Sequence, residues 1–297
     1  MKERSGEYGD VRAADRVFAP QPVVEGAGVR LGRTIGAPQL DYLDPFLLLD
    51  HFASDDPADY IAGFPMHPHR GIETVTYMLA GSVAHKDTMG NEGVIGAGDV
   101  QWMTAGGGLL HEEMPRPVDG HMAGFQLWVN LPAAQKMMPP RYQDVPAATI
   151  PTAELAGGAR VSVIAGEIGE TAGPVHDIVA RPTYFDVRLY PDGVFDYWAG
   201  AGETAFVYLF QGSARIGRRA DDSHVAATSL VVLGEGRRVL VKALGEGTRF
   251  LYVAGRPLGE PIARYGPFVM NTREEIEQAL RDLRDGTFVW EAGRAGA

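Results

Sequence analysis

The chain has 297 residues, of which 45% are hydrophobic and 22% charged, a composition typical of a folded protein with room for two domains. Its 27 basic and 38 acidic residues give a formal net charge of −11, which disfavours direct binding to nucleic acid or to anionic membranes. The absence of cysteine excludes disulfides, thiolate metal sites and thiol nucleophiles.

The N-terminal segment, MKERSGEYGDVR, is polar and lacks the apolar stretch of a secretory signal peptide. No later stretch contains the roughly 18 consecutive apolar residues that a membrane-spanning helix requires. These two observations predict a cytoplasmic protein with no membrane segment.

Short apolar runs separated by turn signals occupy the chain from Val17 to Thr152. They are rich in Val, Thr, Tyr, Trp and Phe and include FLLLDHF, ETVTYMLAG, NEGVIGAGDV, VQWMTAGGG and FQLWVNLP. Runs of this kind predict an antiparallel sandwich or barrel. The proline-rich stretch from Pro132 to Pro151 is expected to be an irregular connector. We therefore predict a first domain over residues 1–152 and a second over residues 153–297.

A second set of strand-like runs follows the connector: RVSVIAGEI, TYFDVRLY, TAFVYLFQG, SLVVLG, RRVLVKA and TRFLYVAG. One helix is predicted at the end of the chain, where Thr272 and Glu275 have the spacing of a capping box. Ile276, Leu280 and Leu283 recur at helical spacing, so the helix is expected to dock an apolar stripe on a sheet. The chain is thus predicted to be all-β with one short closing helix.

The two halves also resemble each other. The segment VTYMLAGS, which begins at Val75, can be laid over AFVYLFQGS, which begins at Ala205, so that Tyr77 meets Tyr208. The Gly-Ser pairs that end the two segments then coincide as well. This match predicts that one sandwich occurs twice.

Six of the eight histidines lie between residues 51 and 121, and two of them form the sequence HPH. In an extended chain, residues two apart share a face, so His67 and His69 can converge on a metal ion. His111 and Glu113 have the same spacing about 40 residues later. Three imidazoles and a carboxylate suit a divalent first-row metal and leave positions open for a reactant.

A second carboxylate competes for the fourth position. Glu73 lies four residues after His69, and this even spacing can return it to the same face of a strand. Spacing alone does not decide between Glu73 and Glu113.

Four long segments carry a resemblance to a known family: HPHRGIETVTYMLAG, GDVQWMTAGGGLLHEEMP, FQLWVNLPAAQKMMPPRYQ and GPFVMNTREEIEQA. They resemble the pirin family of the cupin superfamily, and the resemblance extends from about Gly32 to the closing helix. It implies two jelly-roll β-sandwich domains, with a metal site in the N-terminal one and a metal-free C-terminal one.

The resemblance also implies a ligand set. The positions that match the pirin ligands are His67, His69, His111 and Glu113, so the fourth ligand is expected to be Glu113. Glu73 then becomes a residue that supports the site.

The function that the resemblance implies is a mononuclear metal-dependent dioxygenase of the quercetin 2,3-dioxygenase type. Fe(II) is the favoured ion, a flavonol such as quercetin is the expected small aromatic substrate, and Glu113 is the candidate catalytic base. The alternative is a metal- or redox-responsive regulatory protein that acts through a protein partner. A cavity at the metal would favour the enzyme, whereas a filled site with an exposed apolar patch would favour the regulator.

The internal repeat provides a separate argument about the second sandwich. With Tyr77 on Tyr208 and no gaps, the four ligand positions fall on residues that offer no replacement ligand set: Trp198, Gly200, Lys242 and Leu244. No HxH sequence occurs in the second half. The second sandwich is therefore expected to lack a metal.

An apolar pocket is expected around the ion. Its candidate residues, most of them also candidates for ordinary core positions, are Phe64, Met66, Met78, Trp102, Met103, Phe125, Leu127 and Trp128.

Overall fold

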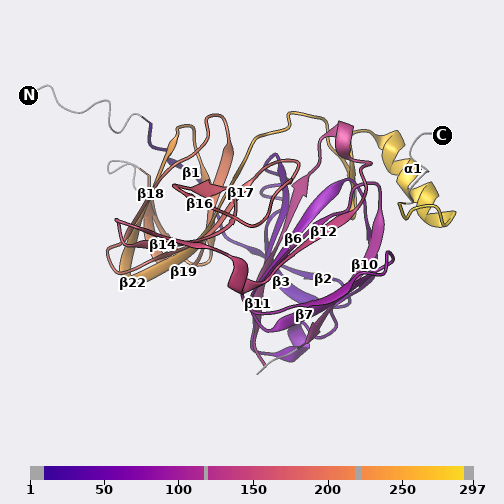
Figure 1. The fold of residues 1–297 in the computed structure, drawn as a ribbon, viewed down its shortest axis with the longest axis horizontal. Coiled ribbons are helices and arrows are strands. Elements are labelled where there is room, and N and C mark those ends of the chain that lie inside the picture. Colours follow the sequence, from indigo (N-terminus) through magenta and orange to yellow (C-terminus); the bar gives the residue numbers. More distant parts are fainter. Residues whose placement is uncertain (1–9, 117–119, 218–222, 291–297) are drawn as a thin grey trace, which may run out of the picture. The chain divides into compact units, whose positions relative to one another are not determined.

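The computed structural model describes residues 10–116, 120–217 and 223–290. Residues 1–9, on which part of the N-terminal prediction rests, lie outside these ranges. The described chain is almost entirely β-structure with a single α-helix near its end, which confirms the predicted all-β fold of two jelly-roll sandwiches (Figure 1). No helix in these ranges has the length and apolarity needed to cross a bilayer.

The chain forms two compact units that are not continuous in sequence. We call residues 21–147 with 258–297 the histidine unit, and residues 148–257 with the N-terminal residues up to Pro20 the apolar unit. The chain passes from the histidine unit to the apolar unit after Ala147, and the closing segment from Leu258 onward belongs to the histidine unit. The reason is backbone pairing, since Arg70 accepts a hydrogen bond from the N–H of Val269 and donates one to Pro267.

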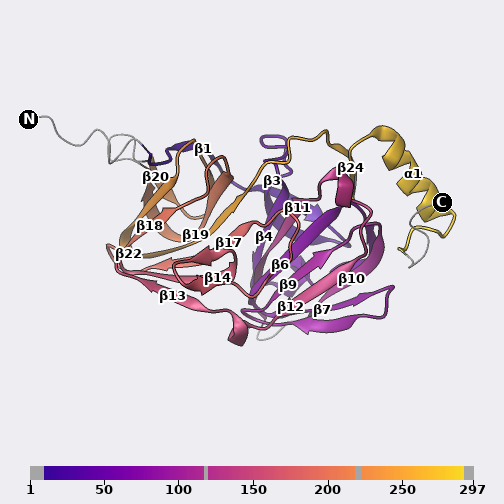
Figure 2. The same cartoon turned by 45° about the horizontal axis from the view of Figure 1, so that its top comes forward.

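The histidine unit contains two main sheets, and Figure 2 shows several neighbouring strands of the larger one. Its order is β12-β9-β6-β11-β4-β3-β2, with the bounds β2 Gln21–Glu25, β3 Val29–Ile35, β4 Phe46–Ser54, β6 Ile72–Ala80, β9 Val100–Thr104, β11 Met122–Asn130 and β12 Arg141–Val145. The smaller sheet has the order β5-β10-β7-β8, with β5 Phe64–His69, β7 Ser82–Asp87, β8 Glu92–Ile95 and β10 Leu109–Arg116. A separate pair is formed by β23 (Ala263–Tyr265) and β24 (Phe268–Met270).

The apolar unit is built around a nine-stranded sheet with the order β1-β21-β19-β22-β17-β14-β13, in which β18 pairs with β22 and β20 with β19. The bounds are β1 Ala14–Phe18, β13 Thr152–Leu155, β14 Ala159–Ala165, β17 Thr183–Leu189, β18 Val194–Trp198, β19 Thr204–Ile216, β20 Ser223–Ala226, β21 Ser229–Leu233 and β22 Arg238–Gly255. A short hairpin joins β15 (Glu167–Ile168) and β16 (Thr171–Ala172). Alternating apolar residues of these strands form one large buried core.

The two segments of the predicted repeat occupy matching places. Tyr77 lies in β6 and Tyr208 in β19, and both strands are central in their sheets. Gly81 and Gly212 follow with φ values of 73° and 77°, a backbone conformation that glycine adopts without steric cost. The chain turns into β7 after Gly81, whereas β19 continues past Gly212 through an irregularity in its pairing.

The closing helix, α1, spans Arg273–Arg284 and begins with the predicted capping box. The Thr272 hydroxyl accepts a hydrogen bond from the Glu275 N–H, and the Glu275 carboxylate accepts one from the Thr272 N–H. The predicted apolar stripe is only partly correct, because α1 packs on β23 and β24 through Ile276 and Ala279 while Leu280 and Leu283 are more than a third exposed. Two strands of three residues each are too short to cover the whole stripe.

Candidate metal centre

Two neighbouring strands carry the predicted ligands. His67 and His69 lie on β5, and His111 and Glu113 lie on β10. The strands are antiparallel, and their register places His111 directly opposite His67. The regular pairing is interrupted between His111 and Glu113, an irregularity of the kind that redirects a side chain near a functional site.

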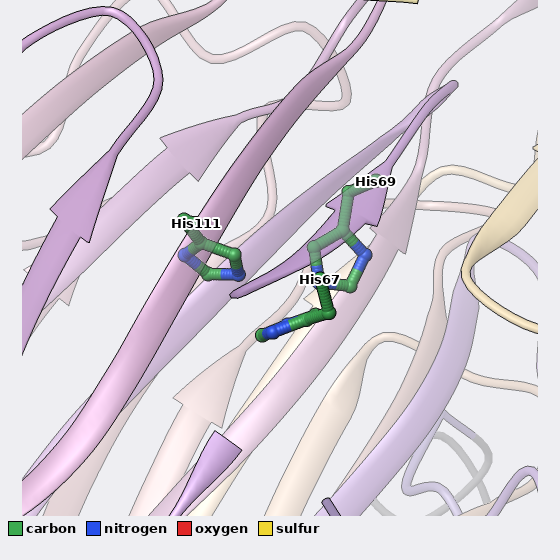
Figure 3. Close-up of side chains that lie close together, drawn as sticks. All are labelled: His67, His69 and His111. Carbon is green, nitrogen blue, oxygen red and sulfur yellow. The ribbon is translucent and has the colours of Figure 1, made fainter. Parts of the chain in front are cut away.

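The three imidazole rings lie close together and are inclined to one another (Figure 3). The ring centroids of His67 and His111 are 4.4 Å apart, those of His67 and His69 are 4.9 Å apart, and those of His69 and His111 are 5.1 Å apart. One nitrogen from each ring lies within 4.8 Å of the others, so the three residues could hold a metal ion. The predicted convergence of the HPH pair with His111 is therefore present in the structure.

Burial prepares these rings for metal binding. It lowers the pKa of His69 and of His111 well below the ordinary value of 6.5, and the neighbouring histidines act in the same direction. Both rings are therefore neutral at physiological pH, the form in which imidazole ligates a metal.

The hydrogen bonding of the rings also fits a metal. The Nδ1 atom of His67 lies 3.0 Å from the Pro65 carbonyl oxygen, which can only accept, so Nε2 keeps its lone pair. Among the described residues, Nδ1 of His69 and both ring nitrogens of His111 are buried without a hydrogen-bond partner. Such orphaned nitrogens are costly in a protein interior unless a ligand such as a metal ion satisfies them.

Glu113 lies beside the three histidines but outside the group of converging nitrogens. Its carboxylate is buried and accepts a hydrogen bond of 3.1 Å from the Thr76 hydroxyl. Burial raises the pKa of Glu113, while His67 and the Thr76 hydrogen bond act in the opposite direction. A cationic metal would favour the ionised carboxylate in this environment.

Glu73 occupies a different environment on β6. It is fully buried and accepts a hydrogen bond of 2.8 Å from the hydroxyl of Thr104, its partner across the β6–β9 ladder. Glu73 is not among the residues that line the cavity described next, whereas Glu113 is.

A cavity of about 550 Å³ borders His67, His69 and Glu113. Two of the predicted pocket residues, Phe64 and Trp128, line it. The remaining six do not: Met66 is 43% exposed, and the others are core residues, namely Met78, Trp102, Met103, Phe125 and Leu127. Strand alternation explains part of this error, because Phe125 and Leu127 point to the face of β11 opposite to Trp128.

A row of polar residues that the sequence analysis missed also lines the cavity. Thr76, Gln126, Asp50 and Arg33 follow one another across the neighbouring strands β6, β11, β4 and β3. The Thr76 hydroxyl lies 2.6 Å from the Gln126 side-chain oxygen, and Arg33 donates two hydrogen bonds of 2.7 Å to Asp50. The alternation of FQLWV, which places Gln126 on the same face as Trp128, was the signal that could have identified part of this row.

The loop that leads into β10 is held by Arg70, the residue after His69. Its guanidinium donates to the carbonyl oxygens of Gly107 and Phe288 and forms an ion pair of 2.6 Å with Asp282 on α1. It also lies over the Phe288 ring, 4.4 Å from the centroid. The closing segment of the chain therefore fixes the backbone that precedes His111.

Comparisons with known proteins agree with this architecture. Residues 28–129 match the Pirin family, and residues 184–289 match the Pirin C-terminal cupin domain. A pirin-like protein of Caulobacter vibrioides is 48% identical over 280 residues, which cover 94% of this chain and 99% of the relative. A Pseudomonas aeruginosa protein provisionally named quercetin 2,3-dioxygenase is 48% identical over 270 residues, covering 89% of this chain and 94% of the relative.

Among solved structures, quercetin 2,3-dioxygenase from Acinetobacter baumannii superposes with a TM-score of 0.84 at 35% sequence identity. The match covers 93% of this chain and 98% of the other. The similarity therefore includes both sandwiches and the strands that carry the histidines.

Proposed function

The chain belongs to the pirin family, and from this premise we propose that it is a metal-dependent dioxygenase that opens the heterocycle of a flavonol such as quercetin. Relatives from Pseudomonas and Acinetobacter that carry the name quercetin 2,3-dioxygenase support this choice of reaction. The reaction consumes one dioxygen per flavonol, both of whose atoms remain in the opened product, while one ring carbon leaves as carbon monoxide. A cytoplasmic location remains a prediction from the sequence.

We propose that His67, His69, His111 and Glu113 hold one divalent ion, with Fe(II) as the favoured metal. When bound, such an ion would supply the positive charge that stabilises an ionised flavonol hydroxyl, and it would supply the redox chemistry of the reaction between the flavonol and dioxygen. The neutral, buried rings of His69 and His111 supply nitrogen donors without first losing a proton.

Glu113 is proposed to take the proton of the flavonol 3-hydroxyl. It lines the cavity together with His67 and His69, so a hydroxyl placed near the histidines is also near this carboxylate. Thr76 donates a hydrogen bond to Glu113 and thereby orients it.

The observation that carries the proposal is the cavity beside the histidines. Its volume of about 550 Å³ and its mixed lining of Phe64, Trp128 and the polar row are those of a small-molecule site. A regulatory protein that reads only the metal state needs no such space. The cavity therefore favours the enzyme over the metal- or redox-responsive regulator.

The direct test is to load the purified protein with Fe(II), measure its metal content, and follow quercetin absorbance and carbon monoxide release in air. We expect quercetin loss with an equimolar release of carbon monoxide, and neither above background in a His111→Ala variant treated in the same way. Quercetin loss by the fully loaded protein that does not exceed that of free Fe(II) would contradict the proposal.

A further inference from the structure

One cationic side chain of the cavity has no ionic partner. Arg264, on β23, lines the cavity, and its guanidinium donates one hydrogen bond of 3.2 Å to the Leu47 carbonyl oxygen. Among the described residues it forms no ion pair. Arg33, the other arginine of the cavity, is by contrast fully engaged, because its three donor nitrogens bind Asp50 and Glu25.

Arg264 is held in a defined place relative to the histidines. Its guanidinium carbon lies over the Trp128 ring, 5.2 Å from the centroid. The His69 ring meets the same indole edge-on, at a centroid distance of 5.2 Å and an interplanar angle of 87°. Through these two contacts with Trp128 the guanidinium lies no more than about 10 Å from the His69 ring, which is within the length of a planar molecule of three rings.

Both like and opposite charges lie near this guanidinium. Partial burial lowers the pKa of Arg264 below its usual value, and the like charge of Arg33 acts in the same direction. The carboxylates of Asp41, Asp50 and Glu25 oppose that effect without reversing it, and two of them already bind Arg33. A guanidinium stays protonated even so, and it binds planar oxygen anions well because its donors form a fixed fork.

We propose that Arg264 is a specificity-determining residue that binds an anionic oxygen group of the substrate at the end remote from the histidines. The proposal rests on the proposed function for the reaction, but it concerns binding in the cavity. It narrows the substrate class to planar aromatic molecules with a metal-binding hydroxyl at one end and an acidic group, a carboxylate or ionised phenol, at the other. Trp128, which lines the cavity, contacts both the Arg264 guanidinium and the His69 ring.

The test compares two flavonols that differ only in that remote group: 3-hydroxyflavone and its 4′-carboxy derivative. Dissociation constants are measured by fluorescence titration of the metal-loaded protein without oxygen. We expect the unaltered protein to prefer the carboxylate by about 10- to 100-fold, the range of a charge-assisted hydrogen-bonded pair in a partly buried site.

Three variants assign that preference. Arg264→Met keeps an apolar stem over Trp128 and is expected to abolish the preference while 3-hydroxyflavone still binds. Arg264→Lys keeps the positive charge but loses the fixed set of guanidinium donors, so part of the preference should remain. This variant also tests the proposal in case the methionine variant folds poorly. Arg30→Met removes an exposed arginine of the same unit and is expected to leave the preference unchanged.

The outcomes separate this proposal from the proposed function. A preference that depends on Arg264 supports the inference even when neither flavonol is consumed in air. Consumption of both flavonols with no preference, or with a preference that survives in Arg264→Met, overturns the inference and leaves the dioxygenase standing. Failure of both flavonols to bind overturns the inference as well.

Discussion

In the histidine unit β10 pairs with β7, and in the apolar unit the first part of β22 pairs in the same way with the second part of β19. Ser82 and Ser213, which follow Gly81 and Gly212, are equivalent positions from which the strands of the two units can be aligned. Ser82 faces Arg116, and Ser213 faces Leu244. Counting back along each strand from these partners places His111 on Val239 and Glu113 on Val241, and both valines are fully buried core residues.

The register corrects the ungapped alignment of the repeat. That alignment placed the two positions on Lys242 and Leu244, three residues too far along. The connection is shorter in the apolar unit, because 29 residues separate Ser82 from His111 and 26 separate Ser213 from Val239. The corrected positions are valines, which cannot ligate a metal, so the second sandwich is still predicted to lack one.

The partner strands differ in the same way. On β5, His67 is the residue that pairs with His111, and on β18, Tyr197 is the residue that pairs with Val239. Tyr197 packs against Phe185 and Tyr252, each with a ring-centroid distance of 5.4 Å. The β18–β22 ladder is also regular where β5 and β10 carry the irregularity before Glu113. One fold thus supports either a ligand site or an aromatic core, and the side chains at a few paired positions decide between them.

The largest expected effect in this comparison is the loss of metal from a His111→Ala variant. Removing one of the four proposed ligands leaves two histidines and Glu113, so the bound metal measured after gel filtration should fall sharply below one equivalent. His176→Ala, which alters an exposed histidine of the apolar unit, is the matched control and should retain full metal content. Stoichiometric metal in His111→Ala would show that the three histidines do not form the site.

Phe195→Ala in the apolar unit is expected to have the opposite pattern, a loss of stability without a loss of metal. Phe195 is fully buried and its ring packs against those of Phe250 and Tyr252, so its truncation should lower the free energy of unfolding by about 3–5 kcal/mol. Urea unfolding measures this loss. The folded variant should still bind a full equivalent of metal, and a loss of metal affinity from the folded state would contradict the division of roles between the two units.

A smaller effect distinguishes the two carboxylates. Glu113→Gln should weaken metal binding by about 10- to 100-fold, since it exchanges an anionic donor for a neutral one beside the histidines. Glu73→Gln should lower stability and change metal affinity by no more than a few-fold, because the Glu73 carboxylate accepts a hydrogen bond from Thr104 and does not line the cavity. Competition titration with a chelator measures both affinities. The reverse pattern would identify Glu73 as the ligand.

The smallest expected effect is a pH dependence of the metal-free protein. Burial lowers the pKa of His51, which stacks on Phe125, to about 4. The unfolded chain binds this proton near pH 6.5 and the folded protein does not, so stability falls as the pH drops from 6.5 toward 4. Between pH 7.5 and pH 5.5 the loss from His51 is about 1 kcal/mol. A His51→Gln variant should show a correspondingly smaller loss in urea unfolding, and an unchanged loss would exclude His51 as its source.

Local features of the sequence were sufficient for several elements of the fold. Strand periodicity, glycine and proline punctuation and the Thr272–Glu275 spacing each act over a few residues, and the structure contains the corresponding strands, turns and helix cap. The HPH pair is equally local, because a strand places residues two apart on one face whatever it pairs with.

Properties that depend on pairing between distant segments were not accessible in the same way. Glu73 and Glu113 have equally suitable spacing in the chain, and only the placement of β6 and β10 puts Glu113 at the cavity and Glu73 against Thr104. The assignment of α1 to the histidine unit depends likewise on backbone pairing between Arg70 and the segment at Val269.

The sequence by itself therefore determined the strand-rich fold, its duplication and the three imidazoles that meet in one sandwich. The tertiary structure decided which carboxylate lies at the cavity, how the polar row from Thr76 to Arg33 lines it, and where Arg264 lies relative to His69. The physical reason is that side-chain direction along one strand follows from the local backbone. Contact between strands depends on register and loop length, and a shift of a few residues exchanges one set of neighbours for another.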